Sequence, residues 1–194
     1  MIPKNNRRAF TLIETLIVVA VLAILASVVL PAMNALGTHS LEAVARTVAA
    51  DLRLARSRAV QYNIECSVFF DSKNSLYELN DSGMGNAPPL ENPLAPTPEP
   101  GVYRIALNPL RQSNSSTATI RFSAVYLTDS QRDVDTVTFQ PLGGTGPVVS
   151  ENTVIWLSEG QDANARHVRL TVSWITGQVW IDEPDTAPPA TTSS

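Results

Sequence analysis

Apolar residues form one long run near the start of the chain and short, regularly spaced groups after it. The run covers residues 10–30 and contains a single charge, Glu14, because residues 15–30 are all uncharged. As a helix rising 1.5 Å per residue, this 21-residue run would be about 31 Å long, close to the ~30 Å hydrocarbon core of a bilayer. The pattern therefore predicts a membrane-spanning helix over residues 10–30.

The helical pattern continues over residues 31–62, where apolar and polar positions separate onto two faces. Apolar positions recur at steps of three and four at Leu41, Val44, Val48, Leu52 and Ala59. Pro31 and Gly37 precede this stripe and favour a bend or a local loosening of the helix. We therefore expect an amphipathic continuation of the same helix, packed on a folded domain.

After residue 63 the period of the pattern changes to two. Alternation over residues 64–71, a turn at 72–75 and a second run at 76–79 predict a β-hairpin. Six further short runs are bounded by turn residues, at 102–108, 119–127, 136–140, 153–157, 168–174 and 178–182. The fold class is therefore α+β, with a long N-terminal helix packed on an antiparallel β-sheet domain over residues 63–183.

Two segments of the chain carry no regular pattern. Residues 80–101 are rich in Pro and Gly and predict an irregular exposed loop, which is either a partner-binding loop or a simple length variation. Residues 184–194 consist mainly of Pro, Thr, Ser and Ala, and we expect a disordered tail.

Basic residues set the orientation of the apolar run. Lys4, Arg7 and Arg8 precede it, and the next basic residue is Arg46, so the positive-inside bias places the N-terminus in the cytoplasm. A secretory signal peptide and a plain single-pass anchor share these features. Neither explains Glu14, because an acidic side chain in the middle of a membrane helix costs about 2.5–3.5 kcal/mol and calls for a partner.

The N-terminal sequence RRAFTLIETLIVVAVLAILASVVLP resembles that of type IV prepilins and type II secretion pseudopilins. The resemblance implies a leader at residues 1–9, cleavage by prepilin peptidase between Ala9 and Phe10, and N-methylation of Phe10. Glu14 then becomes the fifth residue of the mature chain. The residue before the cleavage point is usually Gly in the family and is Ala9 in this chain.

Cleavage would give Glu14 the cation that it needs. The new amine on Phe10 has a reference pKa of about 7.7–8.0 and is mostly protonated near neutrality. It lies about one helical turn from Glu14 in the same chain, and in a filament the amine of an incoming subunit can meet the Glu14 of its neighbour. The alternative is that Glu14 only reaches the headgroups at the cytoplasmic end of the helix.

Three further segments resemble the GspH/FimT family of minor pseudopilins and minor pilins. They are ADLRLARSRAVQYN at residues 50–63, VTFQPLGGTG at 137–146 and RHVRLTVSWITGQVWI at 166–181. The resemblance implies a pilin-like fold, a bacterial inner-membrane protein with a periplasmic C-terminal domain, and incorporation into a pseudopilus. The implied partners are other pseudopilins or pilins, prepilin peptidase, the inner-membrane assembly platform and the membrane itself.

Charge argues against nucleic acid as a partner. The formal charge is −4 and becomes −7 when the three basic residues of the leader are removed. The basic residues that cluster are Arg46, Arg53, Arg56 and Arg58, which could face DNA or a partner but more often form a solvated helix face. We therefore expect no nucleic-acid partner.

The sequence contains no recognisable catalytic or cofactor motif. The glycines at 143–146 lack the following Lys and precede a strand, so they predict a turn instead of a phosphate loop. His39 and His167 have no ligand spacing, and Cys66 alternates with core positions, which predicts a buried residue. Asp133 and Asp135 could bind a cation, although two carboxylates are weak evidence. We expect no enzyme activity, no cofactor, no metal and no small-molecule substrate.

The function that the sequence predicts is structural. The leading hypothesis is a minor pseudopilin that initiates or caps the pseudopilus of a type II protein secretion system. The alternative is a minor pilin of a type IV pilus, including one that takes part in DNA uptake. A membrane-anchored enzyme is a third hypothesis, for which the chain shows no site.

Overall fold

The computed structural model describes residues 12–83, 86–92, 100–108, 119–146, 149–160 and 165–182, and for residues 23–40 the backbone alone. Two compact units divide at residues 38 and 39. Helix α1 (Leu12–Tyr62) belongs to both, and it continues without interruption past Pro31 and Gly37, where the sequence favoured a loosening. Within the described residues, no helix combines the length and the apolar character needed to cross a membrane.

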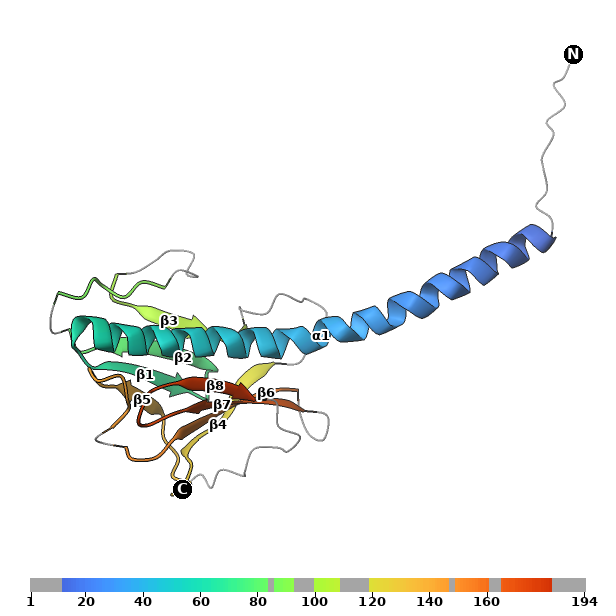
Figure 1. Ribbon diagram of the computed structural model, residues 1–194. Helices are drawn as coiled ribbons and strands as arrows, with labels where there is room; N and C mark the ends of the chain where they lie inside the picture. Colours follow the sequence, from blue (N-terminus) through green and yellow to red (C-terminus); the bar gives the residue numbers. More distant parts are fainter. Residues whose placement is uncertain are drawn as a thin grey trace, which may run out of the picture. The chain divides into compact units, whose positions relative to one another are not determined.

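In its described residues, the second unit (residues 39–194) contains two antiparallel four-stranded sheets (Figure 1). The first has the order β3-β2-β1-β5 and comprises β1 (Cys66–Asp71), β2 (Leu76–Asp81), β3 (Tyr103–Ala106) and β5 (Thr136–Phe139). The second has the order β4-β6-β7-β8 and comprises β4 (Ile120–Leu127), β6 (Thr153–Glu159), β7 (Arg166–Val172) and β8 (Val179–Asp182). The predicted strands are confirmed, whereas their division into two sheets was not predicted.

The turn between β1 and β2 shows how local sequence sets the register. The Asp71 carboxylate accepts hydrogen bonds from the backbone N–H groups of Lys73 and Asn74, at 3.0 and 2.9 Å. This Asx turn reverses the chain so that Asp71 pairs with Leu76 and Cys66 with Asp81. The hairpin predicted from the alternation of residues 64–79 is confirmed.

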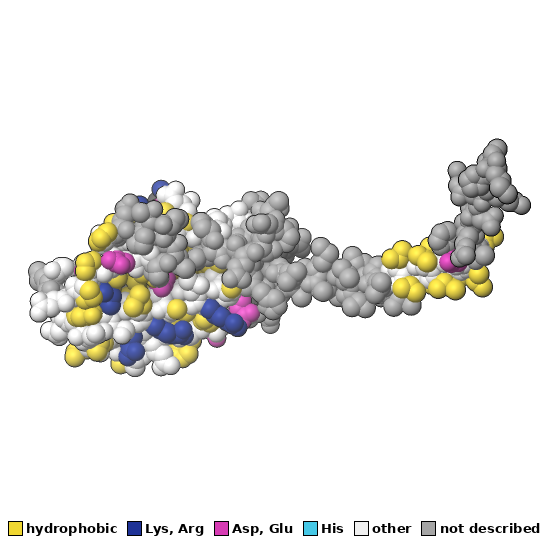
Figure 2. Space-filling model, turned by 90° about the horizontal axis from the view of Figure 1, so that it is seen from above, with side chains coloured by type: hydrophobic (Ala, Val, Ile, Leu, Met, Phe, Trp, Pro, Cys, Tyr) yellow, Lys and Arg dark blue, Asp and Glu magenta, His cyan; other side chains and the backbone are white. Residues whose placement is uncertain are grey.

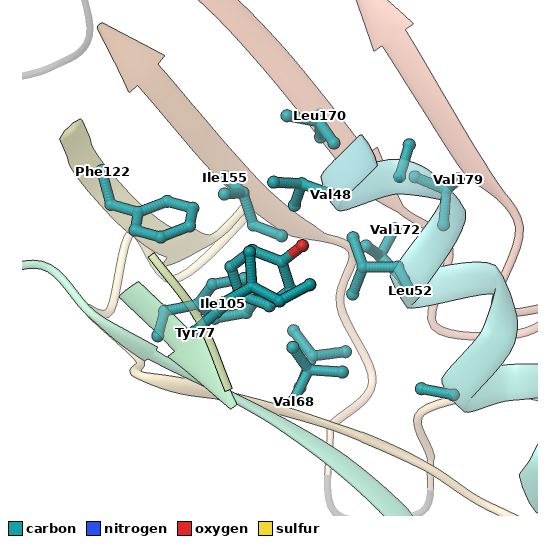
Figure 3. Packing of buried hydrophobic residues seen from close by; sticks show 14 of the residues in the cluster. Val48, Leu52, Val68, Tyr77, Ile105, Phe122, Ile155, Leu170, Val172 and Val179 are labelled. Carbon is teal, nitrogen blue, oxygen red and sulfur yellow. The ribbon is translucent and has the colours of Figure 1, made fainter. Parts of the chain in front are cut away.

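The core lies between the helix and the inner faces of both sheets. Val48 and Leu52 of the predicted stripe are fully buried, and they pack with residues from both sheets (Figure 3). These partners include Val68, Tyr77, Ile105, Phe122, Ile155, Leu170, Val172 and Val179. Burial of one such Leu or Val contributes about 1.5–3 kcal/mol relative to exposure, so this stripe anchors the helix.

Cys66 belongs to this core, as its place in the alternation predicted. Its side chain is fully buried, and burial raises the pKa of its thiol to about 11. The thiolate that a nucleophile requires is therefore scarce at neutral pH. The predicted role of Cys66 as a core residue is confirmed.

Strand β6 departs from simple alternation because all seven of its residues are buried. Ile155 and Leu157 face the main core, while Val154 and Trp156 belong to a second cluster with Ala124 and Tyr126. The Trp156 indole N–H donates a hydrogen bond to the Tyr126 hydroxyl at 3.2 Å. Burial on both faces explains why residues 154–157 of this strand form a continuous apolar run.

Candidate functional site

The first unit presents apolar side chains to its surface. Leu12, Leu16 and Ile17 are 91%, 68% and 55% exposed, and apolar groups surround the helix here (Figure 2). Contiguous apolar surface of this kind marks an interaction with lipid or with another protein. Ala9 and Phe10, the residues of the predicted cleavage point, lie outside the described residues.

Glu14 is an acidic residue within this apolar surface. It lies in the first turn of α1 and is exposed. Ile17 and Val21 follow it at three and seven residues and therefore lie on the same side of the helix. When lipid or apolar helices cover this side, the carboxylate loses water and requires a cation in its place.

In the second unit, two arginines of α1 hold backbone carbonyl groups of the β-sheet domain. Arg56 donates a hydrogen bond from Nε to the Gly143 carbonyl at 3.2 Å, and Arg53 donates one from Nη2 to the Val179 carbonyl at 3.0 Å. Gly143 lies in the turn after β5, and Val179 begins β8. The helix is therefore attached to both sheets by polar contacts as well as by its apolar stripe.

The turn at residues 140–146 and the turn at 173–178 pack backbone against backbone, in a contact that we call the turn junction. Thr145 donates its N–H to the Trp174 carbonyl at 2.9 Å. A Cβ atom on Gly177, whose φ is +65°, would lie 2.0 Å from the Gly143 carbonyl oxygen. A Cβ on Gly144 would lie 2.5 Å from the Ile175 carbonyl oxygen. Only glycine fits at these two positions.

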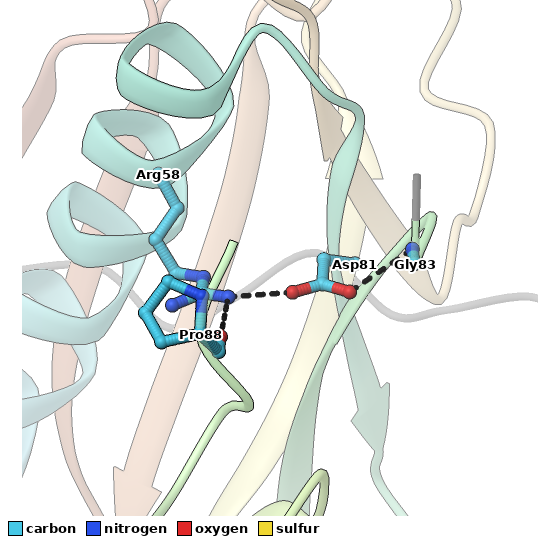
Figure 4. Close-up of polar contacts among 4 residues, drawn as sticks. All are labelled: Arg58, Asp81, Gly83 and Pro88. Atoms are coloured by element: carbon cyan, nitrogen blue, oxygen red, sulfur yellow. Dashed lines mark hydrogen bonds and ion pairs between the residues drawn. The ribbon is translucent and has the colours of Figure 1, made fainter. Parts of the chain in front are cut away.

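Arg58 holds the start of the Pro-rich segment. Its Nη2 donates hydrogen bonds to the Asp81 carboxylate and to the Pro88 carbonyl, each at 2.7 Å (Figure 4). The other oxygen of Asp81 accepts the Gly83 N–H at 3.1 Å. The side chain of Arg58 is only 10% exposed. Arg58 is therefore a buried structural cation, and the expectation of a solvated helix face is wrong for this residue.

Arg46 behaves differently from the other three arginines. Its side chain is 70% exposed and forms an ion pair with Glu42, one helical turn earlier. Such an exposed pair contributes little to stability. Arg46 and Arg53 are exposed and Arg56 is half-buried, so the expected solvated face holds for part of this helix, and of these four arginines only Arg58 is buried.

Asp51 is a buried acidic residue of α1 that the sequence pattern did not predict. Asp51 accepts hydrogen bonds from the hydroxyls of Tyr77 on β2 and Tyr103 on β3, the latter at 2.7 Å. Burial raises the pKa of the Asp51 carboxyl, and the two hydrogen bonds oppose that rise. The available signal was its position, because Asp51 is three residues after Val48 and therefore falls on the apolar stripe.

Among the described residues, the remaining candidate side chains do not come together as a metal site. Asp133 and Asp135 are both exposed, and the described residues contain no group of three metal-ligating side chains. His167 Nδ1 lies 2.8 Å from the Ser158 hydroxyl, but Ser158 is fully buried and out of reach of a substrate. Burial, with Arg121 nearby, lowers the pKa of His167. The side chain of His39 lies outside the described residues.

Comparison with models of known protein families assigns the chain to a family. Residues 4–30 match the model described as a prokaryotic N-terminal methylation motif, and residues 44–177 match the model described as type II transport protein GspH. The chain belongs to the GspH family. The second match covers the arginines of α1 and most of the turn junction. The Arg56 and Thr145 hydrogen bonds bring together the three segments, at residues 50–63, 137–146 and 166–181, that resemble the family in the sequence.

Solved structures similar to this GspH-family chain include two crystal forms of the type IV minor pilin FimU from Pseudomonas aeruginosa strain PAO1. The first is 16% identical, with a TM-score of 0.48, and the match covers 79% of this chain and 96% of FimU. The second is 18% identical, with a TM-score of 0.44, and covers 77% and 98%. No curated protein sequence is a significant match to the chain.

Proposed function

We propose that this chain is a minor pseudopilin, a structural subunit that initiates or caps the pseudopilus of a type II protein secretion system. The observation that carries the proposal is the GspH match over residues 44–177 in a chain whose residues 4–30 match the methylation motif. Proteins of this family and fold are structural. The absence of a catalytic arrangement among the described side chains is consistent with that role.

The proposed cycle begins at the inner membrane. The basic leader stays in the cytoplasm, residues 10–30 span the bilayer and the β-rich domain lies in the periplasm. Prepilin peptidase cuts between Ala9 and Phe10, and Phe10 is N-methylated, which leaves its amine basic. At the assembly platform, the amine of one subunit pairs with Glu14 of another as the apolar helices come together.

Within the second unit, the contacts of α1 suit a subunit that is pulled during assembly. The buried stripe, the Asp51 contacts to β2 and β3, and the arginine contacts to both sheets attach residues 39–62 to the domain. A force applied to this helix is therefore distributed over both sheets. We expect the domain to move with the helix as one body during extension of the filament.

Replacement of Glu14 by Gln tests the proposal directly. Glu14→Gln keeps the size of the side chain but removes the charge, so assembly should fall while the protein stays in the membrane fraction. The measurement is co-purification of the full-length chain with the other filament subunits. Glu14→Asp, which keeps the charge, is the matched control and should retain part of the assembly. Normal co-purification of Glu14→Gln would refute the pairing mechanism.

Mass spectrometry of the membrane-extracted protein tests the processing step. The expected N-terminus is N-methylated Phe10, and Ala9→Gly should not lower the extent of cleavage. An N-terminus at Met1, or one beyond residue 30, would exclude a pilin-like subunit.

The alternative is a minor pilin of a type IV pilus, and the methylation motif is consistent with it because the resemblance extends to both kinds of filament. The two differ in the genes that surround them, so gene neighbourhood distinguishes a secretion role from a pilus role. A role in DNA uptake is disfavoured by the internal contacts of Arg53, Arg56 and Arg58.

A further inference from the structure

The outer face of the second sheet carries a buried apolar cluster. Ile155 and Leu157 of β6 belong to the main core, so the residues that alternate with them lie on the opposite face of the sheet. Four residues form the cluster on that face, and we call them the outer patch: Ala124, Tyr126, Val154 and Trp156. Their exposed fractions are only 3–9%, and that of Trp156 is 3%, as low as in the main core.

The described helix and strands do not account for this burial. All four members of the outer patch come from β4 and β6, and no other described element contributes a buried apolar residue to the cluster. The segment beside β4 extends the sheet in its own plane, through an antiparallel bridge between Tyr126 and Asp133. His167 and Arg169 lie at the sides of the Trp156 ring, 6.2 and 5.9 Å from its centre. Cover over the face therefore comes from another segment.

The chemistry of this face suits a Pro-rich segment. Aromatic rings lie along it at Tyr126, Trp156 and Trp180, the last of which is 43% exposed on β8. Arg169 lies between them, opposite Trp156 on one side and Asp182 on the other, and its Nε–H is buried without a hydrogen-bond partner among the described residues. A polyproline II helix presents proline rings, which pack on aromatic surfaces, and carbonyl oxygens that have no internal donor.

A Pro-rich segment begins at the edge of the same face. Strand β8 ends at Asp182, whose carboxylate accepts a hydrogen bond from Arg169 at 3.3 Å, and three prolines follow within residues 184–189. Trp156 lies two strands away from Asp182, about 10 Å at ~4.8 Å per strand. A polyproline II helix over residues 184–189 is about 19 Å long at 3.1 Å per residue, which is enough to reach β4. Residues 183–194, for which the sequence predicts a disordered tail, lie outside the described residues.

A second Pro-rich segment, residues 93–99, is attached to the first sheet at both ends. Leu90 before it is buried in the main core, and Tyr103 shortly after it begins β3. The tail instead leaves the second sheet at Asp182, on the face that carries the outer patch. The positions of the flanking residues therefore favour the tail as the segment that covers the patch.

We infer that the outer face of the second sheet is a polyproline II binding site, and that residues 184–190 of the same chain occupy it as a strap. The proline rings pack on Trp156 and Tyr126, and a backbone carbonyl oxygen of the strap accepts the Arg169 Nε–H. Because the strap is covalently attached to β8, its effective concentration is high and few contacts are enough to hold it. Proline also limits the conformational freedom that the strap loses on binding. The inference is independent of the proposed function.

Photo-crosslinking locates the strap in the full-length chain. A photoreactive residue replaces Ala187, the crosslinked product is separated by size, and mass spectrometry identifies the joined peptides. A crosslink within one chain, from residue 187 to β4 or β6, supports the inference. A crosslink to another part of the chain, a crosslink to a second molecule, or no crosslink overturns it.

Hydroxyl-radical footprinting, read by mass spectrometry at each aromatic residue, measures the cover. In the unaltered chain, Trp156 should react more slowly than the exposed Trp180. The test variant removes the polyproline II preference by three combined changes, Pro184→Gly, Pro188→Gly and Pro189→Gly. The reactivity of Trp156 should then rise several-fold, toward that of Trp180. The matched control is Thr191→Gly with Thr192→Gly, which lies beyond the strap and should leave Trp156 protected.

Tyr77 serves as the check on folding, because it is fully buried in the main core. If Tyr77 stays protected in the proline variant and Trp156 is as protected as before, the strap is not the cover and the inference is wrong. If the proline variant exposes Tyr77 as well, the crosslinking experiment, in which all three prolines are kept, decides between the two outcomes.

Discussion

Arg56 donates a hydrogen bond from its Nε to the carbonyl oxygen of Gly143, a residue 87 positions further along the chain, at 3.2 Å. This contact joins the helix segment, the turn after β5 and, through the turn junction, the β7–β8 hairpin. These are the three segments that resemble the GspH/FimT family in the sequence. Their common role in the fold is to close the domain at the C-terminal end of α1.

The turn junction should be very sensitive to a single methyl group. Gly177→Ala places a Cβ 2.0 Å from the Gly143 oxygen, and we expect a loss of about 3 kcal/mol in unfolding free energy. Gly83 has nearly the same φ, +63°, but nothing within 4 Å of a Cβ, so Gly83→Ala should cost only about 1 kcal/mol. Urea unfolding of the two variants compares them, and equal losses would show that the close approach is unimportant.

Loss of the Arg58 cation should destabilise the domain far more than loss of Arg46. Arg58→Ala leaves Asp81, 19% exposed, without its ion-pair partner, and the expected loss is about 3 kcal/mol. Arg46→Ala removes an exposed pair one helical turn apart and should cost about 0.5 kcal/mol or less. Chemical unfolding of both variants measures the difference. A small effect of Arg58→Ala would mean that water replaces the guanidinium without penalty.

Asp51 should make stability fall with rising pH. Its pKa in the folded state is raised above the ordinary 3.8, so the folded state holds a proton that the unfolded state has released. The resulting stabilisation is complete below pH 3.8 and is lost as the pH rises through the raised pKa. Asp51→Asn removes this titration and should flatten the unfolding free energy measured across that pH window.

Asp51→Ala is the contrasting variant. It leaves the hydroxyls of Tyr77 and Tyr103 without their acceptor and should cost about 1–3 kcal/mol for each buried group at every pH. If the pH dependence of Asp51→Asn equals that of the unaltered protein, another group is responsible.

DNA should bind the soluble part, residues 38–194, no more tightly than the 10⁻⁴ to 10⁻⁶ M range of non-specific contacts at physiological salt. Long-range attraction is unfavourable for an acidic chain, and Arg53, Arg56 and Arg58 are engaged by the domain itself. Fluorescence anisotropy at several salt concentrations measures the affinity. A much tighter, steeply salt-dependent complex that Arg56→Ala and Arg58→Ala abolish would promote the DNA-uptake alternative.

Periodicity predicted most of the secondary structure. The stripe from Leu41 to Ala59 and the alternation around Cys66 depend on which face of a helix or strand meets the core, and that information is local. Strand pairing is not local: β1 pairs with β5 by bringing Val68 opposite Val137, and nothing in either strand specifies the other. The division into two sheets could therefore not be derived from the pattern.

The same distinction applies to the polar groups. The contacts of Arg53 and Arg56 with the β-sheet domain could not be predicted, because their acceptors are backbone carbonyl groups that carry no sequence signal. Asp51 gave a weak signal by its place on the apolar stripe, but its tyrosine partners are 26 and 52 residues away. By contrast, Glu14 can be singled out from the sequence, because a charge within an apolar run is a local signal, and its pairing role stays a prediction.

The backbone contact between Gly143 and Gly177 also makes the shape of the two turns independent of the side chains that they carry. Because no side chain takes part in that contact, the frame of the two turns does not depend on what residues 142 and 175 display. Those two positions can change without a loss of folding, while the glycines cannot. The two turns thus form a fixed scaffold whose outward side chains are exchangeable, as in surface loops that carry variable residues on a rigid framework.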